Sequence, residues 1–130
     1  MPKVDATLLV IDDVEENCQL LKRRLENKGY KVEFAIDGQE ALLLLSRKKI
    51  DFILLDLDMP VMNGFTFLEK IKSHEKFAHI PVVIASTLDD DDTVNDCLQF
   101  GACGFVYKPY EMDKIYSLIQ SCLHKIAVVG

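Results

Sequence analysis

The sequence predicts an α/β fold in which helices cover both faces of a parallel sheet, a three-layer doubly wound arrangement. Short apolar runs alternate five times with segments of helical spacing along 130 residues. Most of these runs are continuously apolar, which is typical of strands buried on both faces. The hydrophobic fraction of 49% is large enough for one sizeable core, so we expect a single domain.

Five apolar runs are expected to form the strands. They are TLLVI at 7–11, KVEFA at 31–35, DFILL at 51–55, PVVIAS at 81–86 and GFVY at 104–107. The second run alternates polar and apolar residues more than the others.

Each strand is followed by a segment with helical periodicity. Val14, Cys18, Leu21 and Leu25 recur at three or four residues, and Gly29 is a plausible left-handed stop for that helix. The later helices are expected at 37–49, which opens on a capping residue, and at 64–76, 91–101 and 110–125. Because crossovers between parallel strands are right-handed, this order returns every strand in the same direction.

Charge and hydropathy exclude several classes of function. A net charge of -6 without a basic stripe argues against direct nucleic-acid binding. No stretch approaches the ~18 apolar residues of a membrane span, and the short run LLVI is too brief for a signal peptide. We therefore expect a cytoplasmic protein that binds no membrane.

The four cysteines, Cys18, Cys97, Cys103 and Cys122, are scattered without a C-x-x-C pair or a neighbouring histidine cluster. This spacing argues against a zinc site and against a disulfide framework. Free, partly buried thiols are the expected state.

Polar residues gather where the predicted strands end. Asp12 and Asp13 follow the first strand, Asp56 and Asp58 the third, Ser86 and Thr87 the fourth, and Lys108 with Pro109 the fifth. Ligands of doubly wound sheets bind beyond the carboxyl ends of the strands, so this edge is the expected functional site.

If the first and third strands are neighbours, Asp12, Asp13 and Asp56 share one pocket. Two unit charges ~4 Å apart repel by about 4 kcal/mol at an effective dielectric near 20, so the cluster requires a cation. An oxygen-only site without histidine or cysteine favours Mg²⁺, which keeps waters and leaves room for phosphate oxygens.

Two further groups make this a phosphoryl site. The Ser86 hydroxyl and the Lys108 ammonium could hold a phosphoryl group from its other sides. Phosphoryl transfer needs mainly positioning and charge neutralisation, and an aspartate can be the covalent acceptor. Asp56 is the best candidate acceptor because it ends a central strand.

In combination, LLVIDD, LLDLDMPVMNG, PVVIAST and GFVYKP give the chain a specific resemblance to the receiver domains of two-component response regulators. The resemblance covers essentially the whole chain. It implies a flavodoxin-like (βα)5 fold with strand order 2-1-3-4-5. It also implies a receiver domain at 1–126, with 127–130 as a tail or the start of a linker to a second domain.

The resemblance also implies the metal ligands and the acceptor. Asp56 matches the phospho-acceptor, and Asp13 and Asp56 match direct carboxylate ligands of Mg²⁺. Asp12 would act mainly through water, and the backbone carbonyl of Asp58 would be the remaining protein ligand. The position of Asp58 is variable in the family, and an acid there could alter the access of water to the phosphoryl group and thus autodephosphorylation.

The switch residues follow from the same resemblance. Ser86 matches the switch hydroxyl, and Lys108 matches the conserved lysine, whose bond to Pro109 the family often holds cis. Phe105 falls at the switch aromatic. A phenyl ring there can rotate inward but has no hydroxyl to bond.

The implied function is a phosphorylation-dependent switch in a phosphorelay. The phosphoryl donor would be a sensor histidine kinase or a phosphotransfer protein, and the fourth helix, fifth strand and fifth helix would form the read-out face. Such a domain is regulatory and catalyses only its own phosphorylation and dephosphorylation. The output domain or effector is unknown, and both monomer and homodimer remain open.

Two alternatives remain beside this hypothesis. The DLD at 56–58 also fits the motif of haloacid-dehalogenase-like Mg²⁺ phosphatases, although those carry it on the first strand. The other alternative is a degenerate receiver that only binds proteins. The acids, Ser86 and Lys108 argue against it.

Overall fold

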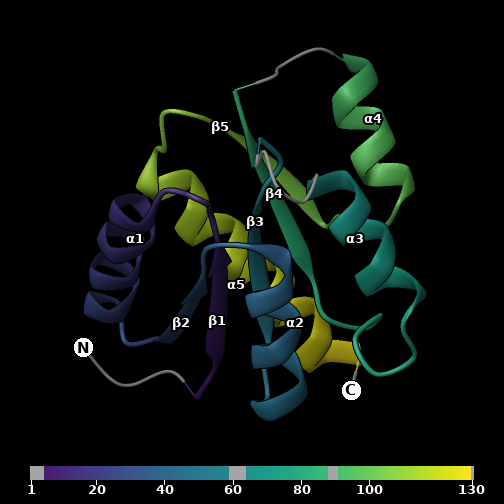
Figure 1. The fold of residues 1–130 in the computed structure, drawn as a ribbon. Coiled ribbons are helices and arrows are strands. Elements are labelled where there is room, and N and C mark those ends of the chain that lie inside the picture. The colour runs from purple at the N-terminus through teal and green to yellow at the C-terminus, as the bar shows by residue number, and fades with distance from the viewer. Residues whose placement is uncertain (1–4, 59–63, 88–90, 130) are drawn as a thin grey trace.

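The computed structural model describes residues 5–58, 64–87 and 91–129, which form five strands and five helices in strict alternation (Figure 1). The strands are β1 (Thr7–Ile11), β2 (Lys31–Ala35), β3 (Phe52–Asp56), β4 (Val82–Ser86) and β5 (Gly104–Tyr107). The helices are α1 (Glu15–Asn27), α2 (Gly38–Arg47), α3 (Gly64–Ser73), α4 (Asp91–Gln99) and α5 (Met112–Val129). The five predicted runs match the strands to within one residue at each end.

All strand pairs are parallel, and the order across the sheet is β2-β1-β3-β4-β5. This confirms the expected α/β class and the strand order that the resemblance implied. β1 lies beside β3 in a register that pairs Ile11 with Leu55, and β3 lies beside β4 with Asp56 opposite Ala85. The residues that follow β1 and end β3 are therefore neighbours in space.

Two apolar layers hold the sheet between the helices. Side chains such as Leu9, Ile53 and Ile84 point to one face and pack with α2, α3 and α4. Alternate residues, such as Leu8 and Leu54, point to the other face and pack with α1 and α5. Figure 1 shows these two helical layers on opposite sides of the sheet. Helices shield both faces of the sheet from solvent, which explains why the strands are almost continuously apolar.

Local signals fix several helix ends. The Asp37 carboxylate accepts a hydrogen bond of 2.8 Å from the Glu40 backbone amide and caps α2, as the sequence predicted. Gly29, after α1, has a φ of 98°, the left-handed conformation expected of a helix stop. α5 continues through Val129, so residues 127–129 extend the last helix. Met59 and Pro60, which follow Asp58 in the motif LLDLDMPVMNG, lie outside the described residues.

The expectation for the cysteines was wrong for two of the four. Cys103 and Cys122 form a disulfide across 19 residues of sequence, with their Cα atoms 6.8 Å apart. The fold packs α5 against β5 and brings the two side chains together, which sequence spacing alone could not show. Cys18 and Cys97 are free and buried, as expected.

Among the described residues, no helix combines the length and the apolar character that crossing a bilayer requires.

Candidate functional site

Four strands deliver side chains to one edge of the sheet. Asp12 follows β1, Asp56 ends β3, Ser86 ends β4 and Lys108 follows β5. The ladder continues just past the strands, because the Lys108 amide donates to the Ser86 carbonyl at 3.0 Å. The structure therefore brings together the segments that the sequence analysis assigned to the site.

The acidic residues converge as expected. Asp12, Asp13 and Asp56 each place a carboxylate oxygen within 4.8 Å of the others. Asp12 and Asp56 are buried, with 0% and 2% of their surface exposed, whereas Asp13 is exposed. Burial weakens the screening of like charges, so two of the three carboxylates repel in a medium of low dielectric.

Asp12 is held by three donors. The Val14 amide donates to its Oδ1 at 2.9 Å, and its Oδ2 accepts from the Tyr110 hydroxyl at 3.2 Å and the Asn17 amide group at 3.4 Å. Burial, and then the nearby charges of Asp12 and Asp56, raise the pKa of Tyr110. The sequence analysis missed Tyr110 and Asn17. The only available signal was the position of Tyr110, two residues after Lys108.

Lys108 lies against the end of β3. Its Nζ is 2.9 Å from Asp56 Oδ1, and only 18% of its side chain is exposed. Burial alone would lower the pKa of Lys108, but the hydrogen bond and charge of Asp56 outweigh it and raise the pKa. Burial raises the pKa of the Asp56 carboxyl, against the opposing effect of Lys108. Lys108 is therefore a fixed ammonium at neutral pH.

Asp58 also directs its carboxylate into the site. Its Oδ1 accepts from the Ser86 hydroxyl at 2.9 Å, and its Oδ2 accepts from the Thr87 amide at 3.0 Å and the Thr87 hydroxyl at 3.2 Å. Burial works to raise the pKa of Asp58, but the Thr87 and Ser86 hydrogen bonds and the Lys108 charge lower it. The sequence analysis had considered the backbone carbonyl of Asp58 and water access, but not this role of the side chain.

The backbone at Asp58 also contacts the candidate acceptor. The Asp58 amide donates to Asp56 Oδ1 at 2.9 Å, so this oxygen receives hydrogen bonds from two sides. Gly64, at the start of α3, packs directly on the same backbone. A Cβ at position 64 would lie 2.6 Å from the Asp56 carbonyl oxygen and 2.7 Å from Leu57 Cα. Glycine therefore allows α3 to begin this close to the end of β3.

Phe105 lies on β5, the strand that precedes Lys108. It is half-buried on the face of the sheet covered by α2, α3 and α4, and its ring centroid is 5.3 Å from that of Tyr107, which is exposed. Phe105 also borders a hollow of about 370 Å³ beside α5, which Lys114 and Leu118 line as well. The ring thus has space next to it at the surface. The peptide bond between Lys108 and Pro109 is cis, as the resemblance implied.

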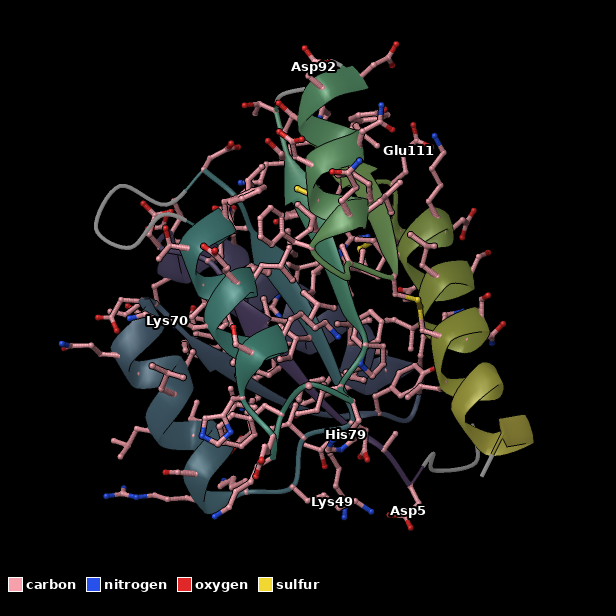
Figure 2. All side chains as sticks on the ribbon, turned by 90° about the vertical axis from the view of Figure 1, so that its right-hand side faces the viewer. Asp5, Lys49, Lys70, His79, Asp92 and Glu111 are labelled. Atoms are coloured by element: carbon pink, nitrogen blue, oxygen red, sulfur yellow. A yellow bond between two sulfur atoms is a disulfide. The ribbon has the colours of Figure 1, made fainter. Side chains whose placement is uncertain are left out.

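Further acids lie at the site end of the molecule. Figure 2 shows Asp92 in the first turn of α4 and Glu111 before α5 at this end, with Lys49 and His79 at the opposite end.

The residues present fit a hard divalent cation. The cluster offers only carboxylate oxygens, and neighbouring backbone and solvent can supply the remaining ligands that Mg²⁺ prefers. Opposite the acids stand an ammonium and a hydroxyl, the groups that bind phosphoryl oxygens. This arrangement can place a cation and a phosphorylated donor on the same carboxylate.

The family model "Response regulator receiver domain" matches residues 8–120. The response regulator PleD of Caulobacter vibrioides is 38% identical over 118 residues, which are 91% of this chain and 26% of PleD. The chain thus spans about a quarter of that relative.

Solved structures show the same fold. The chemotaxis protein CheY4 of Vibrio cholerae superposes with a TM-score of 0.86 at 29% identity, covering 92% of this chain and all of that chain. A two-component response regulator from Clostridium difficile gives a TM-score of 0.87 at 26% identity, covering 94% of this chain and 98% of that one.

The chain belongs to the receiver domain family of response regulators. Acceptance of a phosphoryl group as a signalling switch is the standard role of this family, and the domain is regulatory. The family match sets aside the haloacid-dehalogenase alternative.

Proposed function

We propose that Asp56 accepts the phosphoryl group and that Asp12, Asp13 and Asp56 bind Mg²⁺ beside it. The observation that carries this proposal is the position of the Asp56 carboxylate. It lies 2.9 Å from the Lys108 ammonium and within 4.8 Å of the Asp12 and Asp13 oxygens. These neighbours support the proposal, because a covalent acceptor of a phosphoryl group needs charge neutralisation on both sides.

The transfer is a displacement at phosphorus. An Asp56 carboxylate oxygen forms the new O–P bond while the P–N bond of a phosphohistidine breaks. The electron pair of that bond leaves with the imidazole nitrogen. Lys108 neutralises part of the negative charge on the phosphoryl oxygens, and the Asp58 amide, 2.9 Å from Asp56 Oδ1, orients the carboxylate.

Mg²⁺, when bound, neutralises charge on the acids and on the phosphoryl oxygens. Asp13 and Asp56 would be its direct carboxylate ligands. The three hydrogen bonds to Asp12 hold that carboxylate in place and suit a contact through water. The backbone carbonyl of Asp58 remains the proposed further ligand.

The signal would leave through β4 and β5. The phosphoryl group carries roughly two negative charges and three strong acceptors, and Ser86, directly after the residue that pairs with Asp56, brings a hydroxyl to the end of β4. Because Ile84 pairs with Phe105 across β4 and β5, a shift at the end of β4 reaches the aromatic ring. The surface formed by α4, β5 and α5 would then bind the partner.

The partners follow from the chemistry. The donor would be a cytoplasmic histidine kinase or phosphotransfer protein, and the effector would recognise the α4, β5 and α5 surface. Residues 1–126 would form the receiver unit, and the oligomeric state in each form stays open between monomer and homodimer. Beyond its own phosphorylation and dephosphorylation we propose no catalytic activity.

Incubation with acetyl phosphate and Mg²⁺ tests this function. Intact-protein mass spectrometry should show the addition of one phosphoryl group to the wild-type chain, lost in Asp56→Asn and prevented by EDTA. The control is Asp96→Asn, which removes one exposed acid on α4 outside the cluster and should label normally. Failure of the wild-type chain to label would favour the degenerate, protein-binding alternative.

A further inference from the structure

The side chain of Asp58 accepts more hydrogen bonds than an aspartate at the surface needs. Both of its oxygens accept hydrogen bonds, Oδ1 from Ser86 and Oδ2 from Thr87, over distances of 2.9–3.2 Å. Lys108 Nζ lies 3.8 Å from Oδ2, and only 27% of the Asp58 side chain is exposed. These contacts join segments 28 and 29 residues apart, so they are not a local turn.

The side chain of Asp58 does not belong to the cluster of carboxylates that would hold the cation. Among the described residues, the acids whose oxygens converge are Asp12, Asp13 and Asp56. The Asp58 carboxylate contacts donors from the ends of β4 and β5 instead. Its contacts are hydrogen bonds from donors and an ion pair, which are typical of a bound anion rather than of a metal ligand.

A phosphoryl group on Asp56 would meet the same donors that surround the Asp58 carboxylate. Asp56 pairs with Ala85, directly before Ser86, and its Oδ1 is already 2.9 Å from Lys108. The phosphoryl oxygens are strong acceptors with roughly two negative charges, so they require the donors that Asp58 now occupies. The Ser86 hydroxyl and the Thr87 amide each have one hydrogen to donate, so neither can bond both anions fully, and like charges a few ångströms apart repel strongly.

We propose that the Asp58 carboxylate is an internal competitor of the phosphoryl group. This inference rests on the proposed function of Asp56. Before phosphorylation the carboxylate occupies the donors of Ser86 and Thr87 and lies 3.8 Å from Lys108, and on phosphorylation it leaves and the phosphoryl oxygens replace it. Asp58 is therefore a positioning residue that sets how readily the site accepts an anion.

The exchange also changes how the Ser86 hydroxyl acts as a switch, because it would have an acceptor both before and after phosphorylation. Ser86 is already turned toward the site in the unphosphorylated chain, where its hydroxyl donates to Asp58. Phosphorylation then changes the partner of Ser86 and Thr87, and it releases the bridge between the segments that follow β3 and β4.

Equilibrium binding of beryllofluoride, a non-covalent phosphoryl mimic, tests the competition without hydrolysis. In the presence of Mg²⁺, Asp58→Ala should bind it about tenfold more tightly than the wild-type chain, because no charged hydrogen bonds must be broken. Asp58→Asn keeps the size and one acceptor oxygen but loses the charge, so it should fall between the two. Asp96→Asn is the matched control and should bind as the wild-type chain does.

The amide proton of Thr87 provides a readout that general stability would not move. In the free protein its NMR resonance should lie downfield in the wild-type chain and shift upfield in Asp58→Ala. At saturation with beryllofluoride both proteins should show the same Thr87 resonance, because Asp58 has left.

The outcomes separate this inference from the proposed function. If wild-type binding is present and is lost in Asp56→Asn, but neither Asp58 variant binds more tightly, only the competition is overturned. A Thr87 resonance that still differs at saturation would overturn it as well. If the wild-type chain does not bind beryllofluoride through Asp56, the proposed function fails and the competition fails with it.

Discussion

Replacement of Asp13 by asparagine should stabilise the metal-free chain and remove its response to Mg²⁺. Asp13 contributes one of three carboxylates whose oxygens lie within 4.8 Å of one another. At that separation two unit charges repel by about 3.5 kcal/mol at an effective dielectric near 20, and by about 0.9 kcal/mol in bulk water. Because Asp13 is exposed and Lys108 offsets part of the repulsion, the lower figure applies. We expect Asp13→Asn to raise the free energy of unfolding by about 1 kcal/mol in EDTA.

Mg²⁺ should reverse the order of stability of the wild-type chain and Asp13→Asn. A ligand that binds only the folded state at 100 times its dissociation constant adds about 2.7 kcal/mol of stability. The wild-type chain should gain this amount, while Asp13→Asn, which lacks a carboxylate ligand, should gain under about 1 kcal/mol. The wild-type chain is then the less stable protein in EDTA and the more stable one in Mg²⁺.

Urea unfolding followed by far-UV circular dichroism, with and without Mg²⁺, measures both effects. Asp96→Asn removes the same charge from α4, outside the cluster, and should respond to Mg²⁺ as the wild-type chain does. The reasoning is refuted if Asp13→Asn is less stable than the wild-type chain in EDTA, or if Mg²⁺ stabilises both proteins equally.

Three further predictions concern the packing, the buried tyrosine and the cysteines. Gly64→Ala should cost about 2 kcal/mol or more in urea unfolding because its Cβ would meet backbone, whereas Gly104→Ala, whose Cβ would meet the end of the Leu118 side chain, should cost less; equal losses would contradict this. Since its folded pKa is raised, Tyr110 keeps its proton in the folded chain, and its contribution to stability is lost as pH rises above the unfolded value near 10. Tyr110→Phe should therefore lose less stability than the wild-type chain between pH 9 and pH 11, and parallel curves would refute the assignment. Cys18, whose pKa burial raises to about 12, and Cys97 should not react with Ellman's reagent in the native chain, and denaturation without reductant should expose these two thiols; four thiols at that step would exclude the disulfide.

The fold followed from the sequence because its signals are local and repeated. The apolar run that ends at Asp56 is dry on both faces, and parallel strands bring their carboxyl ends to one edge whatever the side chains are. Asp12, Asp13, Asp56 and Lys108 could therefore be grouped at this edge once the resemblance supplied the strand order.

The remaining contacts depend on side-chain directions that periodicity does not encode. Whether the Asp58 carboxylate turns toward Ser86 or toward solvent is decided by a rotamer and by the donors within reach. The contact between Tyr110 and Asp12 spans 98 residues. The disulfide likewise depends on the distance between β5 and α5 rather than on the spacing of its cysteines.

Chemical mapping of the phosphorylated residue tests the central claim most directly. Borohydride reduction of the protein treated with acetyl phosphate and Mg²⁺ converts an aspartyl phosphate to homoserine, which peptide mass spectrometry then places in the sequence. The account predicts homoserine at position 56 alone. Homoserine at position 12, 13 or 58 of the wild-type chain, with Asp56 unmodified, would contradict it.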